Sequence, residues 1–322
     1  MLSRLAAIPG LAILENAPLR RYTRFAIGGP ARILADASTE AALAGAIQLI
    51  KETGELHAVI GGGSNLVVAD AGFPGVVLRY TSASMEIGAN AVTVAAGAAL
   101  QDLVDAAIAR GLRGLETMTG IPGWVGGAVY GNAGAYGHSI EERVTSVRYS
   151  DGARVCEIDR AACGFSYRES VFKRRKDWIV LSATLRLDPA DPQELRATAD
   201  SILKIRNRKY PPSLHCAGSI FKNLLWDQLP EPVRARLPEH AIREGKVPSA
   251  YFLEQAGAKG LVNGGVRVAD YHANLIYNEG GGTALQIREL IAELKRRVRD
   301  KFGIELEEEV QFIPTLPSPS AV

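Results

Sequence analysis

A stretch of eighteen residues, Gly120–Gly137, constrains this chain more than any other part of the sequence, because seven of them are glycine. Glycine loses more conformational freedom on folding than any other residue, so we expect no ordinary core helix or strand here. A flexible linker would contain more serine and fewer of the Trp, Ile, Val and Tyr side chains present. We interpret the stretch as a compact loop that directs backbone amides at the phosphates of a large, flat ligand. A purely structural loop is the alternative.

A second glycine cluster, Gly61-Gly-Gly-Ser-Asn65, lies between two short apolar runs that we expect to be strands. Glycines let backbone amides approach a phosphate without obstruction by a Cβ atom, and Ser and Asn add donors. The cluster is no Walker loop, since no Gly-Lys-Ser/Thr follows, and no Rossmann fingerprint, since a strand follows it. A plain turn is equally open. Two such loops outside a Rossmann fold indicate one large dinucleotide such as FAD.

The rest of the pattern mixes helices with short strands and predicts an α+β fold rather than a regular parallel α/β fold. Apolar spacing predicts helices at 39–53, 100–110, 193–209 and 283–302, and strands at 57–60, 66–68, 75–80, 91–96 and 178–187. Asp151-Gly152 predicts the turn of a hairpin over 144–158. The prolines of 188–192 mark the main domain boundary, and we expect the Pro- and Ser-rich end, 314–322, to fray.

Composition excludes several functional classes. A chain of 322 residues suggests about two domains, and the excess of basic over acidic residues is only 37 − 35 = 2, so we expect no nucleic-acid partner. Three cysteines without Cys-x-x-Cys spacing predict no metal site and fit a reducing cytosol. No apolar run approaches the roughly 20 residues of a membrane span, and residues 1–14 make a poor signal peptide. We therefore expect a cytoplasmic protein that does not enter a membrane.

Seven motifs together resemble one family, the UDP-N-acetylenolpyruvoylglucosamine reductases (MurB family) of bacterial cell-wall synthesis. They follow that family's order over residues 16–313: TRFAIGGPA at 23–31, GGGSN at 61–65, the glycine-rich stretch at 120–137, FSYRES at 165–170, AGSIFKN at 217–223, FLEQAG at 252–257 and LEEEVQF at 306–312. The resemblance implies an FAD-binding module of the vanillyl-alcohol-oxidase (PCMH) type in two lobes plus a C-terminal α+β substrate domain. It implies a first lobe at 1–78, to which the tail 303–322 returns, a second lobe at 79–190 and a substrate domain at 191–302.

The resemblance also implies an activity. The family uses FAD as its cofactor and NADPH as co-substrate to reduce the enolpyruvyl ether of UDP-N-acetylglucosamine to UDP-N-acetylmuramate, in peptidoglycan precursor synthesis. We therefore expect an oxidoreductase whose partners are a UDP-sugar and NADPH, and we expect a monomer. Two alternatives stay open: another FAD-dependent oxidoreductase or oxidase of the same module that acts on an alcohol or a sugar, and a nucleotide-binding regulator without catalytic activity.

The resemblance assigns the cofactor to the two glycine-rich segments. The residues expected to contact FAD in the first segment are Gly61, Gly62, Gly63, Ser64, Asn65 and Leu66. Those expected in and just before the second segment are Thr119, Gly120, Ile121, Pro122, Gly123, Gly126, Gly127, Asn132, Ala133 and Gly134.

Three residues match the family's catalytic group. Hydride that adds to the terminal enolpyruvyl carbon, C3, leaves negative charge on C2 and the carboxylate, so the site needs a cation or acid at the carboxylate and a proton donor at C2. Arg168 offers a planar fork that matches the carboxylate, and Glu309, if protonated, offers a hydrogen bond. Ser219 matches the proton donor. We expect Glu307 and Glu308, beside Glu309, to be merely solvated.

Taken without the resemblance, these residues have plainer interpretations. Arg168 would be a surface arginine paired with Glu169, and Ser219 an ordinary turn serine. The resemblance further assigns the UDP-sugar to Tyr167, Lys209, Lys222 and Asn223. The chain departs from the family pattern at Gln311, where Arg is frequent, and at 225–246, a longer segment that forms a surface excursion or a lid.

Overall fold

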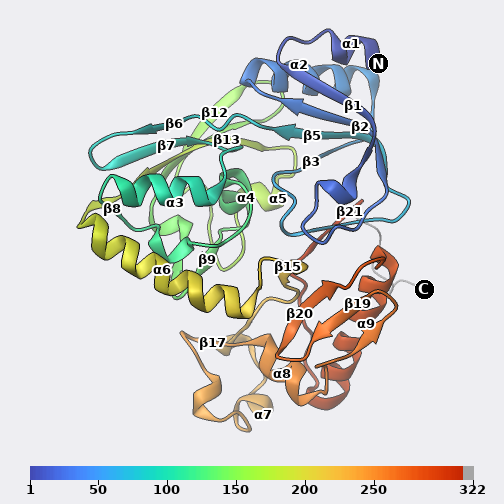
Figure 1. The fold of residues 1–322 in the computed structure, drawn as a ribbon, viewed down its shortest axis with the longest axis vertical. Helices are drawn as coiled ribbons and strands as arrows, with labels where there is room; N and C mark the ends of the chain where they lie inside the picture. Colours follow the sequence, from blue (N-terminus) through green and yellow to red (C-terminus); the bar gives the residue numbers. More distant parts are fainter. Residues whose placement is uncertain (315–322) are drawn as a thin grey trace. The chain divides into compact units, whose positions relative to one another are not determined.

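The computed structural model describes residues 1–314, which divide into two compact units (Figure 1). The first unit contains residues 1–17, 31–63 and 74–208, and the second contains residues 18–30, 64–73 and those from Lys209 onward. Each unit has its own apolar core. Residues 315–322, which hold most of the Pro- and Ser-rich end and part of the predicted returning tail, lie outside the described residues.

A four-stranded sheet and helix α2 form one part of the first unit (Figure 1). The strand order is β1-β2-β5-β3, with bounds β1 Leu11–Pro18, β2 Pro30–Ala37, β5 Phe73–Tyr80 and β3 His57–Val59. Helix α2 (Glu40–Thr53) buries its apolar stripe in the same core as the sheet. The Thr39 hydroxyl caps the helix by accepting from the Ala42 amide at 3.1 Å, and Gly54 ends it at φ +62°. The predicted helix is therefore confirmed, and Thr39 is its N-cap.

A five-stranded antiparallel sheet forms the other part of the first unit. Its strand order is β12-β11-β13-β7-β6, with bounds β12 Val155–Asp159, β11 Val144–Ser150, β13 Ile179–Arg186, β7 Ala91–Ala95 and β6 Met85–Ile87. The predicted hairpin is confirmed, since β11 and β12 join through a turn in which the Asp151 amide donates to the Arg154 carbonyl. The helices of this unit, besides α2, are α1 Leu2–Ala6, α3 Leu100–Ala109, α4 Val125–Tyr130, α5 Val171–Arg174 and α6 Pro192–Lys209.

Helix α4 corrects the expectation that no ordinary helix forms in the glycine-rich stretch. Residues 125–130, Val-Gly-Gly-Ala-Val-Tyr, are helical, and Val125, Ala128 and Val129 are buried. Gly126 makes the packing possible, because a Cβ atom there would lie 2.8 Å from the Cβ of Ala96. A glycine that is unfavourable for a helix in isolation is thus required where the helix approaches its neighbour closely.

The second unit consists of a four-stranded sheet with helices α8 (Ser249–Gln255) and α9 (Ala284–Phe302). The strand order is β15-β20-β19-β18, with bounds β15 His215–Ser219, β20 His272–Asn278, β19 Val266–Ala269 and β18 Val262–Asn263. Phe252 of α8 and Phe302 of α9 pack edge to face, with ring centroids 5.2 Å apart. Two N-terminal pieces of the chain join this core through the buried side chains Phe25, Ile27 and Val67.

Short elements complete the described chain. Strand β21 (Gln311–Ile313) pairs in parallel with β4 (Leu66–Val68), which connects the C-terminal end to the segment after the first glycine cluster. The segment 225–246 starts and ends in a paired strand, β16 (Leu224–Leu225) with β17 (Lys246–Val247), and contains α7 (Glu231–Arg234). The remaining two-residue strands are β8 Leu112–Arg113, β9 Gly134–Ala135, β10 His138–Ser139 and β14 Asp188–Pro189. No helix within residues 1–314 is both long and apolar enough to cross a membrane.

Candidate active site

The two glycine-rich segments lie against each other in the first unit. A Cβ atom at Gly62 would lie 3.0 Å from Cδ1 and 3.2 Å from Nε1 of Trp124, and 3.3 Å from Cα of Gly123. Gly63 has φ +65° and Gly123 has φ +116°, conformations that side chains rarely adopt. Gly63 and Gly123 are therefore needed for the backbone conformation, and Gly62 is needed for the close contact with the second segment.

Two features of this region fit a bound cofactor. A Cβ atom at Gly127, on the exposed face of α4, would meet no heavy atom of the described residues within 4 Å. The Thr119 side chain is buried, and its hydroxyl oxygen has no hydrogen-bond partner among the described residues. A buried hydroxyl usually has a partner, so this one is available to a ligand. Open space over a helix and an orphaned hydroxyl suit the predicted FAD site.

Several amides in the second segment donate to protein oxygens, which corrects the expectation that they face phosphates. The Gly120 amide donates to the Gln101 side-chain oxygen at 2.7 Å, and the Ile121 amide to the Met118 carbonyl at 3.0 Å. Those of Gly126 and Ala133 donate to the Ala96 and Ala128 carbonyls at 2.8 Å. The buried Asn132 side chain donates to Ser166 and Glu141 at 2.8 and 3.0 Å.

Arg168 lies at the tip of a tight turn in the first unit. Ser166 and Glu169 exchange two backbone hydrogen bonds of 3.1 and 3.0 Å, so Tyr167 and Arg168 form the tip. The Arg168 guanidinium donates to the Gly134 carbonyl at 2.9 Å and to the Asn132 carbonyl at 3.4 Å, and it lies 5.3 Å from the Tyr167 ring centroid. The predicted cofactor segment thus also positions the arginine.

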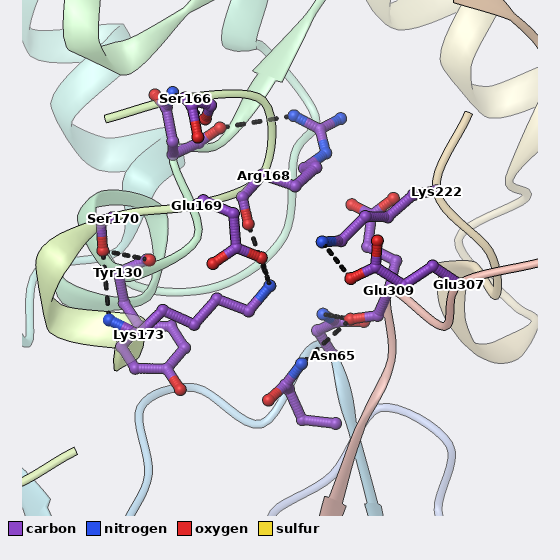
Figure 2. Close-up of polar contacts among 12 residues, drawn as sticks. Asn65, Tyr130, Ser166, Arg168, Glu169, Ser170, Lys173, Lys222, Glu307 and Glu309 are labelled. Atoms are coloured by element: carbon purple, nitrogen blue, oxygen red, sulfur yellow. Dashed lines mark hydrogen bonds and ion pairs between the residues drawn. The ribbon is translucent and has the colours of Figure 1, made fainter. Parts of the chain in front are cut away.

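Lys173 is a partner of Glu169, the residue that the alternative interpretation pairs with Arg168. The Glu169 carboxylate accepts from Lys173 Nζ at 2.8 Å, and the same ammonium group donates to the Arg168 carbonyl at 2.9 Å (Figure 2). Arg168 also has φ +59°, a left-handed conformation that costs a non-glycine residue about 1–2 kcal/mol. Strain of this kind concentrates at functional sites, where the surrounding structure maintains it.

Ser219 and Glu309 lie on neighbouring segments of the second unit. Strand β15 ends with an irregularity between Cys216 and Ser219, and Gly218 there has φ +77°, as in a β-bulge that redirects a side chain. The Glu309 amide donates to the Ile220 carbonyl at 2.7 Å. The backbone of Glu309 is therefore paired with the residue that follows Ser219.

Asparagine residues fix this pairing, and sequence reasoning missed that role. Asn65, predicted to contact FAD, donates from its side chain to the Glu309 carbonyl at 2.9 Å (Figure 2). The fully satisfied, buried Asn274 accepts from the Phe221 amide and donates to the Phe221 carbonyl, both at 2.9 Å. A long sequence separation hides both contacts, although the Asn of the GGGSN motif was a visible signal.

Two further groups beside Ser219 were also missed. The Tyr210 hydroxyl lies 2.8 Å from the Ser219 hydroxyl and 3.4 Å from His272 Nε2. Burial lowers the pKa of His272 from 6.5 to about 3, and the charges of Lys209 and Lys259 act in the same direction. The imidazole is therefore neutral at physiological pH.

The acids beside Glu309 are not merely solvated, which corrects that expectation. Glu307 accepts from Nζ of the buried Lys222 at 2.5 Å (Figure 2), and Glu308 accepts from Lys295 at 3.1 Å. Lys222, predicted to bind the UDP-sugar, thus already has an anionic partner. Lys209 is exposed, with its ammonium group 5.2 Å from the Tyr210 ring centroid, and the Asn223 side chain accepts from the Ser249 amide at 3.4 Å.

The predicted residues fall into two groups by unit. The first unit holds Gly61, Gly62, Gly63, the residues predicted from Thr119 to Gly134, Tyr167 and Arg168. The second unit holds Ser64, Asn65, Leu66, Lys209, Ser219, Lys222, Asn223 and Glu309. Among residues 1–314, no group of three or more His, Cys, Asp and Glu side chains is arranged to hold a metal ion.

Family models match both parts of the chain. Residues 31–153 match the FAD binding domain, and residues 210–313 match the C-terminal domain of UDP-N-acetylenolpyruvoylglucosamine reductase. The first model confirms the predicted FAD-binding module, and the second confirms that a different domain follows it.

Curated relatives are similar over almost the whole chain. A UDP-N-acetylenolpyruvoylglucosamine reductase of Solibacter usitatus is 58% identical over 310 residues, which are 96% of this chain and 99% of the relative. The enzyme of the same name from Bacillus subtilis is 35% identical over 305 residues, 94% of each chain. A crystal structure of such a reductase from Thermus caldophilus superposes with a TM-score of 0.73 at 29% identity, covering 94% of this chain and 99% of the other.

Proposed function

This chain belongs to the family of UDP-N-acetylenolpyruvoylglucosamine reductases, and from that premise we propose how its own residues carry out the reaction. The protein is an FAD-dependent oxidoreductase. It reduces the enolpyruvyl ether of UDP-N-acetylglucosamine to UDP-N-acetylmuramate with NADPH, in peptidoglycan precursor synthesis. We propose that it does so in the cytoplasm and as a monomer.

The glycine-rich segments of the first unit would hold FAD. Gly127 leaves space above α4, Thr119 offers a buried hydroxyl without a partner among the described residues, and Gly62 brings the first turn against Trp124. Bound FAD would supply the hydride-transfer chemistry that links NADPH to the enolpyruvyl sugar. The surrounding protein has to orient the sugar, neutralise the charge that develops on it and supply a proton.

Arg168 and Glu309 would stabilise the enolpyruvyl carboxylate as charge spreads into it. The guanidinium is fixed by the carbonyls of Asn132 and Gly134, so little reorganisation is needed when the anion arrives. Its planar fork matches two carboxylate oxygens, which an ammonium group cannot do. Glu309 in its acid form would add a hydrogen bond to the developing enediolate.

Ser219 would give the proton to C2. Its hydroxyl lies at the end of β15, after the bulge at Gly218, on the segment whose Ile220 carbonyl binds the Glu309 amide. An alcohol is a weak acid, but its partner here is a strongly basic carbanion. The observation that supports this assignment is the pairing of residues 220–222 with 307–309, because Ser219 directly precedes the segment that pairs with Glu309.

The exposed Lys209 is the best candidate among the lysines to bind the diphosphate of the sugar nucleotide. Lys222 could do so only by exchanging its contact with Glu307 for one with the phosphate oxygens. Asn223 and Tyr167 would add neutral contacts to the sugar nucleotide.

Anaerobic spectroscopy of the purified protein tests the proposed function. NADPH should bleach the visible flavin absorbance, and the enolpyruvyl sugar should restore it with formation of UDP-N-acetylmuramate, detected by mass spectrometry. A different result would be that the enolpyruvyl sugar leaves the flavin bleached, while the protein oxidises a simple sugar or an alcohol, or its reduced flavin reacts with oxygen. The protein would then be another member of the FAD-dependent class.

A further inference from the structure

Two groups behind the proposed proton donor extend the site, and we propose that Tyr210 passes a proton to Ser219 while His272 positions the Tyr210 hydroxyl. This inference rests on the proposed role of Ser219. It addresses a chemical difficulty of that role, because a serine that gives up its proton would otherwise be left as a strongly basic alkoxide in a partly buried site.

The geometry places the three groups in one line of contacts. Tyr210 Oη lies 2.8 Å from Ser219 Oγ, a normal distance for a hydrogen bond between hydroxyl groups. On its other side, Tyr210 Oη lies 3.4 Å from His272 Nε2. No other hydroxyl or carboxyl group is needed to connect Ser219 to the imidazole.

Packing holds the line in place. Tyr210 follows helix α6 directly and packs on the buried side chains of Cys216, Ala269 and Leu275. Its ring meets the His272 ring edge to face, with centroids 5.7 Å apart at 64°. His272 begins strand β20 and is only 9% exposed, so its ring cannot move far without disturbing the sheet.

The direction of the hydrogen bonds follows from the chemistry. For Ser219 to protonate the substrate, its O–H bond must point away from Tyr210, so Tyr210 donates to Ser219 Oγ. The neutral imidazole then donates from Nε2–H to Tyr210 Oη, since a neutral histidine has one donor nitrogen. The low pKa of His272 keeps this donor uncharged at physiological pH.

The proton transfers balance along this line. The electron pair at C2, left after hydride has added at C3, takes the Ser219 proton and forms a C–H bond as the serine O–H bond breaks. Tyr210 gives its proton to the serine oxygen, so the negative charge ends on a phenolate rather than an alkoxide. A phenol is a much stronger acid than an aliphatic alcohol, and the His272 N–H stabilises the phenolate until water reprotonates it.

The test compares Tyr210→Phe with wild type in separate half-reactions of the holoenzyme. The variant keeps the ring and its packing but removes the hydroxyl. Flavin reduction by NADPH, flavin content, thermal midpoint and binding of the enolpyruvyl sugar to the oxidised protein should stay unchanged. Reoxidation by the sugar should slow by at least about tenfold, and by no more than the ~10²–10⁴-fold that a positioned acid contributes. Tyr277→Phe is the matched control. Tyr277 packs on the same apolar cluster, but its hydroxyl contacts Glu279, so its removal should leave both half-reactions unchanged.

A double-mutant cycle with Ser219→Ala shows whether Tyr210 acts through Ser219. In the alanine background, Tyr210→Phe should cause no further slowing, because the group that it serves is gone. Normal reoxidation in Tyr210→Phe, equal slowing of both half-reactions, or the same slowing with and without Ser219 would each overturn the inference. Normal reoxidation in Ser219→Ala alone would instead refute the proposed role of Ser219, and with it this extension.

Discussion

Replacing Gly127 by alanine separates the stability of helix α4 from the binding of the cofactor. Gly127 is exposed, and an added methyl group would meet no atom of residues 1–314 within 4 Å apart from its own helix backbone and chain neighbours. Any loss on substitution must therefore come from something other than the described residues. We predict that Gly127→Ala raises the stability of the flavin-free protein and weakens its binding of FAD.

The expected magnitudes have opposite signs. Alanine is more favourable than glycine in a helix interior by about 0.8–1.0 kcal/mol, and no steric contact with another described element opposes this gain. For a cooperative unit of this size, this gain corresponds to a rise of about 2–4 °C in Tm. If FAD covers Gly127, overpacking by one methyl group costs about 1–3 kcal/mol, which weakens binding roughly 5- to 150-fold.

Gly126→Ala is the matched control on the same helix. Its Cβ atom would lie 2.8 Å from Cβ and 3.1 Å from the carbonyl oxygen of Ala96, so this variant should be destabilised even without flavin. Thermal unfolding of flavin-free protein and fluorescence titration with FAD measure the two effects. A Gly127→Ala protein that bound FAD as tightly as wild type would refute the assignment of this glycine to the cofactor site.

Three further predictions concern the site and its surroundings. Arg168→Lys should slow reoxidation of the flavin by the enolpyruvyl sugar, because lysine keeps the charge but loses the planar guanidinium fork. In stopped flow, NADPH should still reduce the flavin at the normal rate. Equal slowing of both steps would instead assign Arg168 to the part of the site that serves the cofactor. Iodoacetamide should alkylate Cys156 alone in the native protein, since Cys163 and Cys216 are fully buried and burial raises the pKa of Cys163 to about 12. Mass spectrometry measures the labelling, and alkylation of either buried cysteine would contradict the packing described above. His272 has a pKa of about 3 in the folded protein, so between about pH 6.5 and 3 it binds a proton only in the unfolded chain. The free energy of unfolding should therefore fall as the pH drops through this range, by up to about 1.4 kcal/mol per pH unit. Urea unfolding of His272→Gln should show a weaker dependence on pH, and an equal dependence would contradict this prediction.

Local patterns predicted most of the regular elements. Helix α9 is an example, because Thr283 and Gln286 form a capping box at its start and Gly303 ends it at φ +68°. The spacing of its apolar residues and both end signals lie within about twenty consecutive positions. The glycine-rich stretch was harder, because the close approach of α4 to Ala96, which requires glycine at position 126, is not visible in the sequence.

The parts of the site that escaped prediction depend on contacts between distant positions. Asn65 and Glu309 are 244 residues apart, and no periodicity connects them. The role of Tyr210 could not be foreseen either, since its hydroxyl meets His272 only after β15 and β20 have paired. The pairing of Glu307 with Lys222 likewise depends on the register between two loops. Motifs thus predicted which segments carry chemistry, and tertiary structure decides which groups cooperate.

Stopped-flow measurement of Ser219→Ala tests the central claim most directly, because the two half-reactions can be followed separately through the flavin absorbance without oxygen. Bleaching by NADPH should proceed at nearly the wild-type rate, since this step needs no proton at C2. Return of the absorbance on addition of the enolpyruvyl sugar should be slower by about 10²–10⁴-fold. Reoxidation at the wild-type rate, in a variant with normal flavin content, would contradict the account and would leave another group to protonate C2.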